Sequence, residues 1–257
     1  MDDASPEPKI ETAPARAPGE VIYRHRLATR IWHWVNAVTI FVMIGSGLTI
    51  LNAHPHLYWG EYGANFDHAW LHTPHWPAWL TIPSQYNLAL ARRWHLTFAL
   101  LLGFGLLFFM IASLINRHFQ RDLRVRAKEV APKHLIDDAV AHARFDFHNH
   151  DDPAAYNTLQ KLSYVATIFV MIPLMILTGL AMSPAMDAAW PWLLDIFGGR
   201  QSARSIHFIA AALLVGFTIV HLTLVILAGP VGEVMSMITG RWRLPGASPA
   251  PEPEPTE

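Results

Sequence analysis

The segment Ser205–Leu227, SIHFIAAALLVGFTIVHLTLVIL, is almost wholly apolar and long enough to cross a bilayer. It nevertheless carries two histidines, His207 and His221, fourteen residues apart. Ionisable side chains at membrane depth are costly and by default mark a functional site. Fourteen residues is close to four helical turns, so the two side chains share one face at depths about 21 Å apart. The segment therefore predicts a transmembrane helix that presents two ligands at two depths.

The composition is that of a membrane protein, with 52% apolar and 15% charged residues. The net charge of -1 gives no electrostatic basis for binding nucleic acid. Cysteine is absent, which excludes disulfides, thiolate-held iron–sulfur clusters and covalent c-type haem. Any redox centre must use other ligands, and the chain contains 15 histidines.

Hydropathy predicts an all-α integral membrane protein built as a four-helix transmembrane bundle. The four spans are Ile31–Leu51, Leu96–Ile115, Leu162–Met182 and Ile206–Leu227. Pro173 predicts a kink in the third span, and a surface helix is expected around Lys133–Ala143. The bundle domain is predicted over 21–245, between disordered tails at 1–20 and 246–257 that are rich in Pro, Ala and acidic residues. The N-terminal tail lacks the apolar core of a signal peptide.

The basic residues are unevenly distributed between the two sides of the predicted bundle. The N-terminal arm, the loop 116–161 and the C-terminal arm hold 15 of the 19 Lys and Arg residues. The positive-inside rule therefore predicts that both termini are cytoplasmic. The other side carries a long loop, 52–87, that is rich in aromatic residues and histidine and is expected to lie at the headgroup level.

Four histidines lie in or at the edge of the predicted spans, and the topology sets their depths. His33 and His221 fall toward the cytoplasmic side, whereas His95 and His207 fall toward the outer side. Two imidazoles per level do not suit zinc, which takes four protein ligands or three and a water. Haem iron needs two axial ligands only, so the pattern predicts two bis-histidine b-type haems.

Two further sets of residues bear on these haems. Arg92, Arg93 and Arg204 stand next to the outer histidines and are candidates to pair with haem propionates, with interfacial anchoring as the alternative. Small residues could let a flat macrocycle approach the helices, although ordinary helix packing uses them too. They are Gly45, Gly47, Gly103 and Gly105.

The motifs HRLATRIWHWVNA (25–37), RRWH (92–95) and the fourth-span His-x13-His pair resemble the bacterial di-haem cytochrome b family, of the cytochrome b561 type. That family supplies membrane subunits to nickel–iron hydrogenases, formate dehydrogenases and thiosulfate reductases, and NAHPHLYWG (52–60) looks closest to the thiosulfate-reductase branch. The resemblance implies that His33 and His221 hold the inner haem and that His95 and His207 hold the outer haem. It also implies a location in the bacterial cytoplasmic membrane.

The function implied by this resemblance is electron transfer between membrane quinone and a partner oxidoreductase, expected to be an extracytoplasmic molybdopterin enzyme. One alternative is a self-sufficient membrane redox enzyme that acts on a small molecule such as superoxide. Another is a haem-free transporter with proton-relaying histidines, although the spans lack the carboxylates expected of such a relay. The outer-loop histidines His68, His72 and His75 have helical spacing, but Pro74 disfavours a helical metal site there.

Overall fold

The computed structural model describes residues 19–63, 68–83, 86–117, 119, 125, 130–143 and 158–244. The predicted disordered tails, apart from Gly19 and Glu20, lie outside these ranges. Four helices are long and apolar enough to cross a membrane. They are α1 (Leu27–Ala53), α2 (Leu88–Ile115), the run α5–η3–α6 (Thr158–Ala181) and α9 (Arg200–Ala228). The predicted four-helix membrane architecture is thus confirmed.

Each of the four helices begins before the span predicted from hydropathy. The second starts at Leu88 instead of Leu96 and the fourth at Arg200 instead of Ile206. Hydropathy marks only the part of a helix that lies in hydrocarbon, whereas arginine-bearing turns continue into the headgroup zone. A helix of 29 residues such as α9 is about 43 Å long, longer than the hydrocarbon core of about 30 Å.

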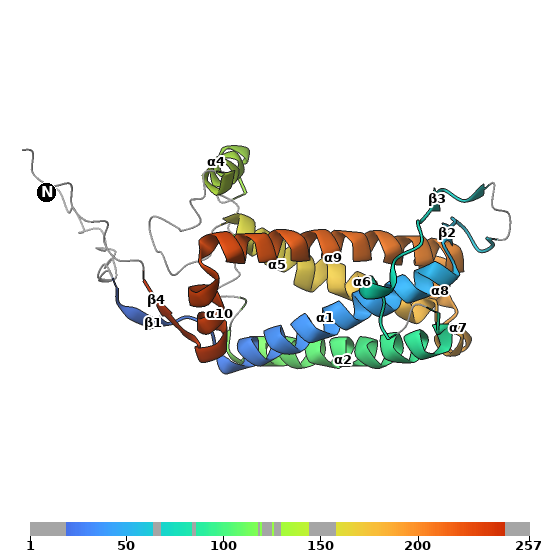
Figure 1. The fold of residues 1–257 in the computed structure, drawn as a ribbon, viewed down its shortest axis with the longest axis horizontal. Coiled ribbons are helices and arrows are strands. Elements are labelled where there is room, and N and C mark those ends of the chain that lie inside the picture. The colour runs from blue at the N-terminus through green and yellow to red at the C-terminus, as the bar shows by residue number, and fades with distance from the viewer. Residues whose placement is uncertain are drawn as a thin grey trace, which may run out of the picture.

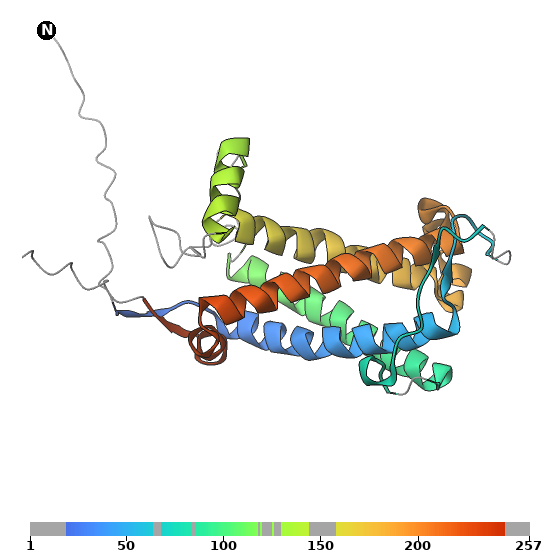
Figure 2. The ribbon, with the colours of Figure 1, turned by 45° about the horizontal axis from the view of Figure 1, so that its top comes forward.

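The helices pack as an elongated bundle in which α1 lies along α2 and α6 lies along α9 (Figures 1 and 2). One core cluster joins α1, α2 and η3 through Met43, Leu102, Phe109 and Ile168. Many leucine, isoleucine and phenylalanine side chains on the outer faces remain exposed. An exposed apolar surface of this extent is expected where lipid covers the protein.

The third span contains a π-helical turn, η3 (Thr167–Met171), between α5 (Thr158–Ala166) and α6 (Ile172–Ala181). The Ile172 amide donates to the Thr167 carbonyl, five residues back, as a π-helix requires. Pro173 follows directly and has no amide proton, and its ring would clash with a carbonyl four residues earlier in a regular helix. The irregularity predicted at Pro173 is therefore a widened turn just before it.

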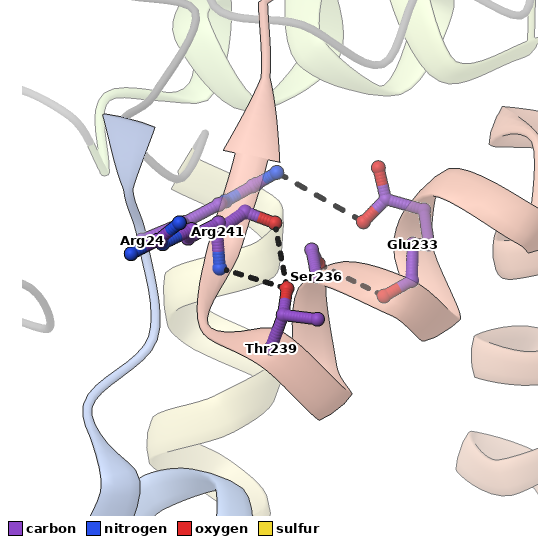
Figure 3. Close-up of polar contacts among 5 residues, drawn as sticks. All are labelled: Arg24, Glu233, Ser236, Thr239 and Arg241. Atoms are coloured by element: carbon purple, nitrogen blue, oxygen red, sulfur yellow. Dashed lines mark hydrogen bonds and ion pairs between the residues drawn. The ribbon is translucent and has the colours of Figure 1, made fainter. Parts of the chain in front are cut away.

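The two ends of the described chain meet at one end of the bundle. Strand β1 (Val21–Tyr23) pairs with β4 (Arg241–Arg243), which follows the short helix α10 (Pro230–Thr239). Arg24 lies over the Trp242 ring and 3.9 Å from the Glu233 carboxylate, as Figure 3 shows for the ion pair. These contacts, here called the terminal clasp, hold both arms against the same end of the bundle. The loop helix α4 (Pro132–Ala143) confirms the surface helix predicted around Lys133–Ala143.

The opposite end carries two short helices, α7 (Pro184–Ala189) and α8 (Trp192–Phe197), a 3-10 turn η2 (Ala78–Leu80) and the outer-loop hairpin β2–β3 (Figure 1). The hairpin pairs His56–Leu57 with Leu71–His72. It is fastened to the start of α9, because Gly60 donates to the Ser202 hydroxyl (2.7 Å) and the Trp70 indole donates to Ser205 (2.9 Å). The outer loop is therefore anchored to the helix that carries two of the predicted ligands.

Candidate functional site

The first histidine pair lies toward the clasp end of the bundle. His33 projects from α1 and His221 from α9, with ring centroids 6.2 Å apart and ring planes at 62°. The Phe217 ring stacks on His221 one helical turn away, and Trp34 meets His33 edge to face. His33 Nδ1 is buried and has no hydrogen-bond partner among the described residues. We call this arrangement the inner pair.

The second pair lies toward the end that bears the outer-loop hairpin. His95 of α2 faces His207 of α9, again with ring centroids 6.2 Å apart and with planes at 60°. The structure thus brings together the same partners that the depth argument paired from the sequence. We call this arrangement the outer pair; its separation from the inner pair is about 21 Å along α9, from the fourteen-residue spacing.

The spacing within each pair fits two axial ligands on one metal ion. A bond of about 2.0 Å from imidazole nitrogen to metal, plus about 1.1 Å from nitrogen to ring centre, puts two coaxial rings about 6.2 Å apart. Both pairs have this separation. No group of three or more His, Cys, Asp or Glu that could hold a metal occurs within the described part of the chain. A donor set of two neutral imidazoles suits an iron whose other four ligands come from a macrocycle.

Buried hydroxyl groups contact both rings of the outer pair. Ser46 Oγ, on α1, lies 3.0 Å from Nδ1 of His95. Thr178 Oγ1, on α6, lies 2.9 Å from Nδ1 of His207. Both residues are fully buried, and sequence reasoning missed them. The available signal was that each immediately precedes a glycine, in Ser46-Gly47 and Thr178-Gly179, within an apolar span.

These two glycines face the outer pair. A Cβ atom built at Gly47 would lie 3.5 Å from Cε1 of His95, and one at Gly179 would lie 3.6 Å from Cε1 of His207. Of the glycines highlighted in the sequence, Gly47 thus stands at the site, whereas a Cβ at Gly45 would overlap Ile82 at 2.7 Å. Each outer imidazole is therefore flanked by a small residue and held by the hydroxyl before it.

Two of the three arginines proposed for propionates gather at the outer end of α1. The Arg204 guanidinium donates to the backbone carbonyl of His54. Burial first, and then the positive charges of Arg204 and Arg92, lower the pKa of His54 below its ordinary value. An anion bound here would meet both guanidinium groups. Arg93 is exposed, and no contact in the described residues joins it to this cluster.

The outer-loop histidines do not lie on one helix, as Pro74 led us to expect. His72 lies in β3, where it pairs with His56 of β2 at a ring-centroid distance of 4.5 Å. His75 follows in an extended stretch beyond Pro74. The segment is a hairpin and not a helix, so the spacing of His68, His72 and His75 does not place them on one helical face.

Comparison with known proteins gives one family and several relatives. Residues 24–240 match the family model described as prokaryotic cytochrome b561. A protein of Azospira oryzae that carries the name of a protein-methionine-sulfoxide reductase subunit, YedZ1, is 28% identical over 81% of this chain and 92% of its own length. No solved structure matches the chain.

Two further relatives carry the name of a Ni/Fe-hydrogenase B-type cytochrome subunit. The Rhodobacter capsulatus protein is 21% identical, over 78% of this chain and 72% of its own length. The Cupriavidus necator protein is 24% identical, over 85% of each chain. None of these names is that of a thiosulfate reductase, so that branch stays a prediction.

Proposed function

This chain belongs to the prokaryotic cytochrome b561 family, and from that premise we propose that it carries electrons across the bacterial cytoplasmic membrane through two b-type haems. It is a multi-pass membrane protein and a cytochrome b subunit of a membrane redox complex. The proposed electron path joins the quinone pool, at the inner haem, to an extracytoplasmic redox subunit, at the outer haem.

The observation that carries this proposal is the pair of facing histidines at each of two levels. His33 with His221, and His95 with His207, show the same 6.2 Å separation. One helix, α9, contributes a ring to each level, and two other helices, α1 and α2, complete the pairs. A protein that held one haem would need only one such pair, so the duplication supports two.

Each group of residues then has a defined task. The inner and outer pairs would hold one haem each, and the bound haem supplies one-electron redox chemistry. Arg92 and Arg204 would neutralise propionates at the outer end, and Arg93 remains a third candidate there.

The orientation rests on the distribution of charge. Both ends of the described chain meet at the clasp end (Figure 1). The inner pair lies nearer that end, because His33 stands close to the start of α1. The positive-inside rule assigns that end to the cytoplasm. The inner pair is therefore proposed to lie on the cytoplasmic side and the outer pair on the extracytoplasmic side.

An open, shallow surface groove lies at the clasp end, and its walls are mostly apolar. Its walls are Leu27, Arg30, Ile31, Trp34, Val35, Met237 and Ile238. Trp34 contacts the His33 ring, so a lipid-soluble molecule in this groove would lie one side chain away from the inner pair. Quinones, which dissolve in the membrane, fit that approach.

The partner is proposed from the relatives. Their names assign them to complexes with a hydrogenase or a methionine-sulfoxide reductase. The resemblance to the thiosulfate-reductase branch implies a molybdopterin enzyme on the extracytoplasmic side. The exposed face near the outer pair carries several aromatic side chains, among them Tyr62, Trp79 and Tyr86. Such residues are enriched at protein interfaces as well as at the headgroup level.

The proposal is tested by purifying the tagged protein from its native membranes. We expect a short-chain quinol to reduce the haems, and we expect a redox subunit that contains molybdenum to co-purify. Haems that quinol leaves oxidised would contradict the quinone link. Turnover of superoxide or another small molecule by the isolated chain, with no partner recovered, would favour the self-sufficient enzyme instead.

A further inference from the structure

Ser46 and Thr178 occupy equivalent places on opposite sides of the outer pair. Each side chain is completely buried, with 0% of its surface exposed, and each lies within hydrogen-bond distance of the Nδ1 atom of one ring. Each also reaches a carbonyl of its own helix. Ser46 Oγ is 3.2 Å from the Met43 carbonyl, and Thr178 Oγ1 is 2.6 Å from the Leu174 carbonyl.

The hydroxyl protons decide the direction of these bonds. A hydroxyl has one proton, and a carbonyl can only accept. When the Thr178 hydroxyl donates to the Leu174 carbonyl, its oxygen must accept from the imidazole, so Nδ1 of His207 carries the proton. The same accounting applies to Ser46, the Met43 carbonyl and His95. In a neutral imidazole the other nitrogen, Nε2, then carries the lone pair that binds a metal.

The inner pair lacks this support. His33 Nδ1 is buried without a partner among the described residues. Within the described part of the chain, His221 contacts the rings of Phe217 and His33, and no hydroxyl contact is found. A ligand imidazole that donates a hydrogen bond through its remote nitrogen is oriented more firmly and becomes a stronger base. The two levels therefore differ in a property that sets reduction potential.

We propose that Ser46 and Thr178 are positioning residues for the outer haem: they fix His95 and His207 in the Nδ1-protonated form and lower the reduction potential of that haem alone. The stronger base stabilises the oxidised iron, which lowers the potential. Because the two haems are themselves part of the proposed function, the test must count haems as well as measure potentials.

The test uses isosteric changes that remove each hydroxyl, Ser46→Ala and Thr178→Val, singly and together. The readouts are the haem-to-protein ratio and a potentiometric titration that resolves two haem potentials. Each lost bond should shift the oxidised-to-reduced ratio of the outer haem by roughly two- to tenfold toward reduced haem. The inner potential should stay unchanged. Conservative changes that keep the hydroxyl, Ser46→Thr and Thr178→Ser, should restore the original potential.

The matched control is Thr49→Val. Thr49 is also buried in α1, but its hydroxyl lies 3.2 Å from the Gly45 and Ile82 carbonyls, to which its one proton can be donated, and it contacts neither ring. We expect this variant to keep both haem potentials. A His33→Ala protein should hold the outer haem alone. Its single reduction potential therefore shows which of the two potentials belongs to the outer haem.

The outcomes separate this proposal from the di-haem function. Two haems with unchanged potentials in Ser46→Ala and Thr178→Val would overturn the positioning role and leave the electron-transfer role intact. The positioning role would also be overturned if Ser46→Thr and Thr178→Ser shifted the outer-haem potential as much as Ser46→Ala and Thr178→Val do. An equal shift of that potential in Thr49→Val would overturn it too. A wild-type protein without two haems would instead overturn the proposed function itself.

Discussion

The small residues at Gly47 and Gly179 give a quantitative test of the outer site. A Cβ at either position would lie at ordinary contact distance, 3.5 or 3.6 Å, from a ring of the outer pair. Alanine therefore fits without movement. Leucine adds three carbon atoms beyond that Cβ, and these must enter space already held by the imidazole or required by the haem. Gly47→Ala should keep the outer haem, whereas Gly47→Leu should bind it more weakly and retain less of it on purification.

The size of the effect follows from the cost of overpacking. Extra methylene groups forced into a packed interior typically cost about 1–3 kcal/mol. Applied to haem binding, that is roughly a 5- to 150-fold loss of affinity for the outer haem. Gly179→Leu should act through His207 in the same way and to a similar degree. The inner haem, about 21 Å away along α9, should be unaffected.

The assay is the haem-to-protein ratio of each purified variant, measured by the pyridine haemochrome spectrum. The control is Gly216→Leu, because a Cβ there meets nothing within 4 Å and the position lies nine residues from His207, on the opposite face of α9. A Gly47→Leu protein with two haems and an unchanged outer potential would refute the reasoning. Equal haem loss from Gly216→Leu would show that the effect is not local.

Four further outcomes are expected. His221→Ala should leave one haem per chain in a haemochrome assay, and a count of two would contradict the inner assignment. Arg204→Gln should raise the pKa of His54, measured by NMR, because it removes a cation that lowers that pKa. An unchanged pKa would contradict the placement of Arg204 beside His54. Since the folded state lowers this pKa, folding stability should fall as pH drops from about 6.5 through the lowered value, a trend that thermal unfolding across pH would check. Gly240→Ala should reduce the free energy of unfolding by about 1–3 kcal/mol and so lower the unfolding temperature. The reason is that Gly240 has φ +80° and a Cβ there would lie 2.7 Å from the His25 carbonyl. An unchanged unfolding temperature would show that the terminal clasp contributes little to stability.

The arrangement of the four histidines was predictable because helical geometry converts sequence spacing into depth. The fourteen residues from His207 to His221 fix two levels on one helix. Alternating direction of the spans then assigns one partner to each level, His95 outside and His33 inside. The structure places the same partners face to face.

The hydroxyls of Ser46 and Thr178 could not be singled out in the same way. Serine and threonine in apolar helices ordinarily bond to a carbonyl of their own helix, and both do so here. Their second contact, with a ring on another helix, depends on how the helices rotate against each other. Packing sets that rotation, and a single sequence does not reveal it.

The pairing of strands that are distant in the sequence could not be predicted either. Strand β1 (Val21–Tyr23) pairs with β4 (Arg241–Arg243), near the other end of the described chain. Segments of three residues carry too little pattern to predict a strand. The contact of Gly60 with Ser202 likewise joins a loop to a helix start 142 residues away. Hydropathy also cannot separate a π-helical turn from a regular one, so Pro173 marked the place but not the form of the irregularity.

The most direct test of the central claim is the haem content of the wild-type protein. A dithionite-reduced minus oxidised spectrum of purified protein, with a pyridine haemochrome count, measures it in one preparation. Two b-type haems per chain are predicted, one for each facing pair of histidines. A colourless protein, made with ample haem, would contradict the electron-transfer account and favour a haem-free transporter.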